Sequence, residues 1–166
     1  MEYKYEIHSH TKNTSLCGQL DAEELVKLYK EAGYSGIVIT DHYSPMTFTP
    51  SEFLKKNKAV DHFLQGYRKA KKFEDESFSV LLGVELRFYA TVNDYLIYGV
   101  KEEMLYHFPF LLPLYIKKAS KLFRQKGCLF MQAHPYRKFI IRANPKYLDG
   151  IEVFNAKSTK EENDNA

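Results

Sequence analysis

Short apolar runs alternate along the chain with longer segments in which apolar residues recur at helical spacing. Runs such as GIVI and SVLLGV, which end in polar residues, are typical of buried strands in a parallel sheet. We predict helices over residues 20–34, about 52–76 and most of 102–126. The predicted strands cover residues 3–8, 36–42, 78–86, 94–100, 127–135 and 150–155. Strands that alternate with helices predict an α/β fold with mainly parallel strands.

The ends of the predicted helices carry recognisable signals. Asp21 can cap the first helix, Glu24 stands three residues further on as in a capping box, and Gly33 can end the helix. Pro109 and Pro113 are expected to interrupt the last helical region, because proline removes a backbone donor and clashes with the preceding turn.

Composition narrows the class of protein. The chain has 166 residues, of which 45% are hydrophobic and 27% charged, and this predicts one soluble globular domain. A net charge of +3 gives no indication of a nucleic-acid partner. Cys17 and Cys128 are the only cysteines, so no disulfide framework is expected. With no signal peptide and no apolar run of membrane-spanning length, we expect a cytoplasmic protein without a membrane partner.

Histidines and acidic residues gather where the predicted strands end. His8 and His10 are two residues apart, so on a strand they share one face. Carboxyl ends of strands in such sheets meet at one edge, where sites form. The polar residues at these ends are His8, His10, Asp41, His42, Glu85, His134, Glu152 and Asn155.

Imidazoles and carboxylates together are ligands for first-row transition metals. Glu85 lies centrally enough in the chain to bridge two ions. A GxSxG nucleophile elbow and a glycine-rich phosphate loop are both missing from the sequence, which disfavours serine hydrolase and P-loop chemistry. The structural alternative is a set of buried polar groups that satisfy one another in the core.

Five motifs in order resemble the PHP family, named for polymerase and histidinol phosphatase, over about residues 3–156. They are HSHT (8–11), GIVITDHY (36–43), GVE (83–85), AHPYR (133–137) and GIEVFN (150–155). The resemblance implies a distorted seven-stranded (β/α) barrel. It further implies phosphoester hydrolysis at two or three divalent Mn, Zn or Fe ions. We predict a single domain over residues 1–156 and a polar tail over 157–166.

Carried over residue by residue, the resemblance assigns ligands to three metal positions. His8, His10 and Glu85 would hold the first ion, and His42 would contribute to the second. Glu85 and His134 would share the third.

Other candidates around this set have open roles. Asp41, next to His42, could orient that ligand or the end of its strand. Cys17 could be a thiolate ligand of the second ion or a small buried residue beside the Gly18 turn. Asp94 and His107 are two further candidate ligands.

The sequence departs from the family in its last part. The family supplies a late Asp-x-His, and this chain stops at Ala166 without one. We therefore predict an incomplete barrel, with an open strand edge that a second copy could cover. The alternative function is a truncated, inactive PHP-like domain that binds metal or a partner without turnover.

Basic residues near the predicted ligands indicate a phosphorylated substrate. Arg137 is the expected phosphate clamp, because a guanidinium matches two phosphate oxygens, and Arg87 is a second candidate. Lys138 and Arg142 are expected on a solvated face, and Tyr43 could touch the substrate or line the rim of the site. The predicted reaction is hydrolysis of a small phosphomonoester or a nucleotide by attack of metal-bound hydroxide.

Overall fold

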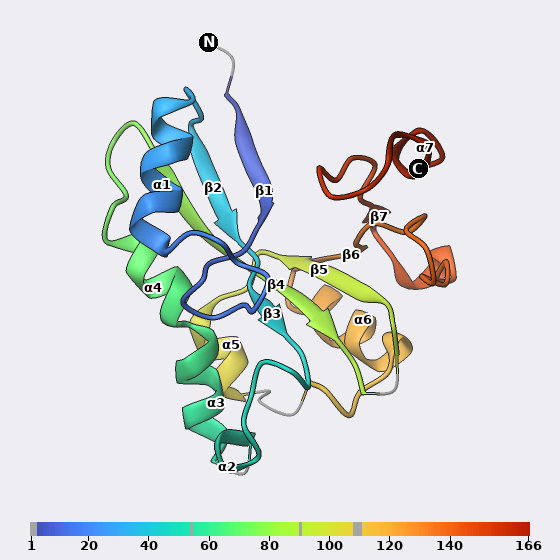
Figure 1. Cartoon of the computed structure of the whole chain (residues 1–166). Coiled ribbons are helices and arrows are strands. Elements are labelled where there is room, and N and C mark those ends of the chain that lie inside the picture. The colour runs from blue at the N-terminus through green and yellow to red at the C-terminus, as the bar shows by residue number, and fades with distance from the viewer. Residues whose placement is uncertain (1–2, 54, 90, 108–110) are drawn as a thin grey trace.

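A curled, open sheet of seven strands forms the centre of the molecule (Figure 1). The computed structural model describes residues 3–53, 55–89, 91–107 and 111–166. The strands follow the order β1-β2-β4-β5-β6-β7, and β3 pairs beside β2 on the same edge of β4. Their bounds are β1 (Tyr5–Ser9), β2 (Gly36–Ile39), β3 (His42–Tyr43), β4 (Ser79–Arg87), β5 (Asp94–Tyr98), β6 (Leu129–Gln132) and β7 (Gly150–Ile151). Because β1 and β7 stand at the two ends of this order and do not pair with each other among the described residues, the sheet is a half-barrel, as the incomplete barrel was predicted to be.

The strands are mainly parallel, as predicted, with one exception. The pairs β1–β2, β2–β4, β3–β4 and β6–β7 are parallel, whereas β5 is antiparallel to both β4 and β6. Only residues 88–93 separate β4 from β5, and a parallel crossover needs a dozen or more residues. The start of β5 therefore lies at the edge where β4 ends.

The predicted helices are present, but two of them are divided. The first matches α1 (Ala22–Glu31), with the Asp21–Glu24 capping box formed and Gly33 at a φ of 77°. Pro113 lies between the two helices into which the predicted helical region 102–126 is divided, and Pro109 falls outside the described residues. The others are α2 (Pro50–Phe53), α3 (Lys56–Phe63), α4 (Gln65–Lys71), α5 (Glu102–His107), α6 (Ile116–Arg124) and α7 (Lys160–Asp164), with a 3₁₀ turn at Pro145–Tyr147. Among the described residues, none of these helices is long and apolar enough to cross a membrane.

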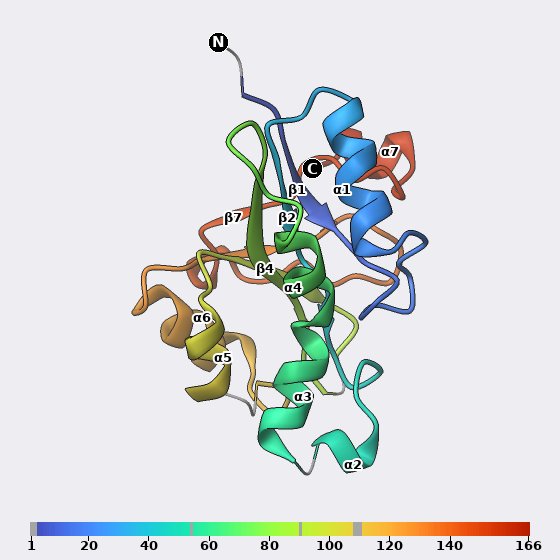
Figure 2. The same ribbon diagram turned by 90° about the vertical axis from the view of Figure 1, so that its left-hand side faces the viewer.

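Alternation along β4 separates the core from the site. Leu82, Val84 and Leu86 pack into the main apolar cluster, while Glu85 points to the opposite, concave face. Figure 2 shows α1, α4 and α3 in front of the sheet. Tyr43 pairs in register with Leu86, so it shares the core face and is 1% exposed. The prediction that Tyr43 lines the rim of the site is therefore wrong.

Gly66 offers a test of the packing under the site. A Cβ there would lie 2.0 Å from Thr11 Oγ1 and 2.3 Å from Asp41 Oδ2. Alanine in a helix normally gains about 1 kcal/mol over glycine, but overpacking here is expected to lower the free energy of unfolding by about 1–3 kcal/mol. Urea unfolding of Gly66→Ala measures whether the free energy of unfolding falls or rises. The control is Gly150→Ala, which meets only the flexible end of Met131; an unchanged or raised stability of Gly66→Ala would contradict the packing argument.

Candidate metal centre

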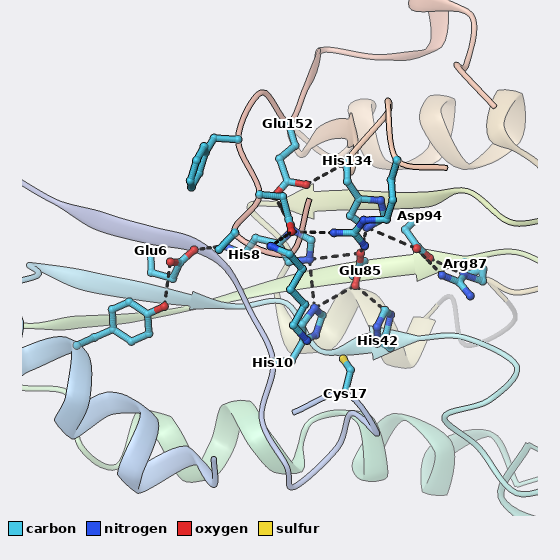
Figure 3. A pocket seen from close by; sticks show the side chains of 16 residues that line it. Glu6, His8, His10, Cys17, His42, Glu85, Arg87, Asp94, His134 and Glu152 are labelled. Carbon is cyan, nitrogen blue, oxygen red and sulfur yellow. Dashed lines mark hydrogen bonds and ion pairs between the residues drawn. The ribbon is translucent and has the colours of Figure 1, made fainter. Parts of the chain in front are cut away.

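The carboxylate of Glu85 lies at the middle of four imidazole rings (Figure 3). Its Oε1 is 3.3 Å from His8 Nε2 and 3.1 Å from His134 Nε2, and its Oε2 is 3.2 Å from His10 Nε2 and 3.0 Å from His42 Nδ1. Glu85 itself is 1% exposed. The structure thus brings together all four histidines that the sequence places at strand ends.

Local backbone geometry aims these side chains. His42 pairs in register with Glu85 across β3 and β4. In β1 the register shifts, since Glu6 pairs with Ile37 but Ser9 with Ile39, and His8 lies within this irregular stretch. His134 follows β6 with a φ of 30°, an uncommon conformation for a residue with a side chain, and such conformations concentrate at functional sites.

The polar atoms fit a metal ion better than they fit one another. His8 Nε2 and His10 Nε2 lie 3.2 Å apart although both also face Glu85. Glu85 Oε2 is buried and accepts no hydrogen bond from any described residue, despite two ring nitrogens nearby. Lone pairs that converge in this way are satisfied by a cation, and imidazole with carboxylate is a donor set of Mn, Zn and Fe.

Among the residues that the structure describes, three overlapping groups of side chains have the spacing of a metal site. Within each group, one ligand atom from every residue lies within 4.8 Å of the others. The groups are His8, His10 and Glu85; His10, Cys17 and His42; and His42, Glu85 and Asp94. Cys17 is only partly buried and is grouped with His10 and His42, which favours the ligand interpretation over that of a plain core residue.

Glu152 holds two of the histidines from outside the ring cluster. Its Oε1 is 2.7 Å from His8 Nδ1, and its Oε2 accepts a hydrogen bond of 2.8 Å from the backbone N–H of His134. A carboxylate on the far nitrogen of a histidine fixes the tautomer and orientation of the ring. The sequence placed Glu152 at a strand end but gave it no role; its acidic character there was the available signal.

Asp41 lies beneath the site and does not line the cavity. It accepts hydrogen bonds of 2.7 Å from the backbone N–H of Thr11 and from the hydroxyls of Thr11 and Ser15. The Ser15 hydroxyl oxygen in turn accepts from the backbone N–H of His42 at 2.9 Å. Burial raises the pKa of Asp41 above its ordinary value, although these hydrogen bonds act against the shift. Asp41 is thus placed to position His42 and not to touch a substrate.

Of the two further candidate ligands, Asp94 lies at the site and His107 lies away from it. Asp94 is 1% exposed at the start of β5, and its Oδ2 is 3.7 Å from His134 Nε2. His107 is exposed at the end of α5, where its Nδ1 lies 2.8 Å from the carbonyl oxygen of Glu103. Only Asp94 reaches the cavity, and the antiparallel course of β5 is the reason.

The centre strongly favours positive charge. Burial lowers the pKa of His8, but hydrogen bonds to Glu152 and Glu85 outweigh it and raise this pKa to about 10. The pKa of His42 is also raised to about 10, because interactions with Cys17 and Glu85 outweigh the lowering effect of burial. Burial acts to raise the pKa of Glu85, yet the four histidine rings around its carboxylate hold this pKa well below its ordinary value. A cation bound here therefore competes with protons.

A cavity of about 330 Å³ opens onto the centre. Arg137 lines it, and its Nη2 donates to Asn155 Oδ1 at 2.8 Å while its buried Nε has no partner among the described residues. Lys138 and Arg142 lie over the rings of Phe139 and Tyr136 and outside the cavity lining, as expected of a solvated face.

The chain belongs to the PHP domain family, whose model matches residues 6–163. No curated protein matches the sequence. The fold is that of solved PHP-type structures, so the resemblance that the five motifs indicated is confirmed.

Three solved structures show the likeness in fold. A chain from Bifidobacterium adolescentis, described as a "putative metal-dependent phosphoesterase", aligns with a TM-score of 0.60 at 13% identity, over 99% of this chain and 82% of its own. PsfC from Pseudomonas syringae PB-5123 gives 0.60 at 13% identity, over 92% and 66%. An amidohydrolase from Chromobacterium violaceum, with bound sulfate and no metal, gives 0.56 at 11% identity, over 98% and 81%.

His8 and His62 form a matched pair of substitutions. His8 faces Glu85, whereas His62 pairs with Glu52 at 2.8 Å and lies outside the cavity. We expect His8→Ala to weaken metal affinity by at least about tenfold and His62→Ala to leave it unchanged. Elemental analysis after equilibrium dialysis, on protein purified without a metal-affinity tag, measures both. Equal occupancy in the two variants would remove His8 from the ligand set.

Metal binding is expected to release protons. Because the pKa of His8 and of His42 is raised to about 10, both rings are in the positively charged, doubly protonated form at pH 8. A histidine that ligates a metal must be neutral, so each ring has to lose one proton. Apparent affinity should therefore rise as the pH rises toward 10 and fall on acidification. Calorimetric titration in two buffers of different ionisation enthalpy counts the protons. Identical binding heats in both buffers would contradict the charge state assigned to the rings.

Proposed function

We propose that this protein is a metal-dependent phosphoesterase that hydrolyses a small phosphomonoester or a nucleotide. Membership of the PHP domain family supports a metal-dependent hydrolase, and so does the likeness to the Bifidobacterium chain.

One observation carries the proposal: the ring cluster around Glu85 and the side chain of Arg137 line the same cavity. Mn, Zn or Fe ions, when bound, supply Lewis acidity and activate water. The residues that would hold them are His8, His10, Cys17, His42, Glu85 and His134. A site for divalent cations beside a guanidinium suits an anionic substrate whose charge grows during reaction.

Arg137 is the residue proposed to bind the phosphate group. Asn155 and Ser158 accept from its Nη2 at 2.8 and 3.5 Å, which fixes the side chain, while the buried Nε has no partner in the described part of the chain. An unpaired buried donor costs free energy, and a phosphate oxygen would satisfy it with a charge-assisted hydrogen bond. Arg87 lines the same cavity, but Asp94 engages its guanidinium.

The remaining carboxylates support the ligands. Glu152 fixes the ring of His8 and the backbone of His134, and Asp41 acts on His42 through Ser15. These contacts hold the ring nitrogens toward Glu85 before any ion or substrate arrives. Such preorganisation reduces the reorganisation that binding must otherwise bring about.

Arg137→Ala tests the assignment. With p-nitrophenyl phosphate as probe and Mn²⁺ or Zn²⁺ supplied, we expect turnover by the wild type and a KM raised roughly tenfold to a hundredfold in the variant, the loss of one charge-assisted hydrogen bond. The control is Arg142→Ala, which lies outside the cavity. An unchanged KM would contradict the assignment of Arg137 as the residue that binds the phosphate group. Metal-loaded wild type without turnover on this probe or on nucleoside monophosphates would instead support a PHP-like domain that binds metal without catalysis.

A further inference from the structure

Arg87 and Asp94 form a fixed ion pair at the edge of the metal centre. Arg87 Nε donates to Asp94 Oδ1 at 2.7 Å, and Nη2 donates to Oδ2 at 2.5 Å. The two residues are cross-strand partners in the antiparallel β4–β5 pair. The arrangement is bidentate, the strongest geometry for a guanidinium and a carboxylate.

Asp94 also belongs to one of the three groups with metal-site spacing. Together with His42 and Glu85 it could offer ligand atoms to an ion, and its Oδ2 is 3.7 Å from His134 Nε2. It is 1% exposed, so its charge cannot be left to water and must be balanced by a cation nearby. The cation that the structure shows there is the guanidinium of Arg87.

We propose that Arg87 takes the place of a metal ion beside Asp94, so that the centre of this chain binds at most two divalent ions. The inference rests on the proposed metal-dependent function and limits its stoichiometry. Two groups without Asp94 remain in the described part of the chain, namely His8, His10 and Glu85, and His10, Cys17 and His42.

Electrostatics gives the physical reason. A third ion ligated by Asp94 would have to share that carboxylate with the guanidinium, and like charges beside one carboxylate repel each other. Arginine does not lose its proton in proteins, so deprotonation cannot relieve that repulsion. Such an ion would compete with the two hydrogen bonds that Arg87 already donates to Asp94.

Counting bound Zn²⁺ tests the inference. Tag-free protein stripped with a chelator is dialysed against Zn²⁺ and its metal content is measured. The wild type is expected to bind at most two equivalents, Arg87→Met one more, and the double variant Arg87→Met/Asp94→Asn again the wild-type number. Arg87→Lys, which keeps the charge, and Arg142→Met, which lies outside the cavity, are the controls and should match the wild type.

The single variant Asp94→Asn covers the case in which Arg87→Met fails to fold. It should keep the wild-type metal content, because Asp94 is not a ligand while Arg87 holds it; loss of one equivalent would overturn the inference. Three equivalents in the wild type, or a folded Arg87→Met with the wild-type number, would also overturn it while leaving the proposed function standing. A wild type that binds no metal would contradict both this inference and the proposed function.

Discussion

A carboxylate buried to 1% exposure, with four imidazoles around it, is the constraint on which this structure depends. An isolated charge at the position of Glu85 would cost many kcal/mol, so compensating groups must lie beside it. The stretch at the end of β1 brings His8 and His10, β3 brings His42, and the segment after β6 brings His134. The half-barrel therefore converges on one residue of its longest strand, and the core behind β4 fixes that strand in place.

The two carboxylates that support the histidines, Asp41 and Glu152, are buried and must also be satisfied by hydrogen bonds. Asp41 ties the segment after β1 to the start of β3, and Glu152 ties β1 to the segment after β6. Stability and function are thus coupled at these positions, because a change that frees a support also releases a ring from its orientation.

Much of this arrangement could be predicted from the sequence, because strand-end positions and two-residue spacing are local patterns. His8 and His10 share a face and Glu85 sits on a buried run, so their convergence follows from parallel strands. The link of residues 88–93 is too short for a parallel crossover and so indicates the reversed direction of β5, but the register that pairs Asp94 with Arg87 cannot be deduced from the sequence. Tyr43 was misplaced because a two-residue strand carries no visible alternation, and its register with Leu86 is a tertiary fact.

The polar segment after residue 156 shows how far a site can extend beyond its motifs. It holds no buried residue in α7, so no apolar pattern marks it. Yet Asn163 bonds both the backbone N–H and the carbonyl oxygen of Asn155, and Asn155 accepts from Arg137 while donating to Glu152. Arg137 and Glu152 thereby share one amide side chain. Because each of these contacts is polar and partly exposed, the segment contributes little to stability by burial and acts mainly by fixing geometry.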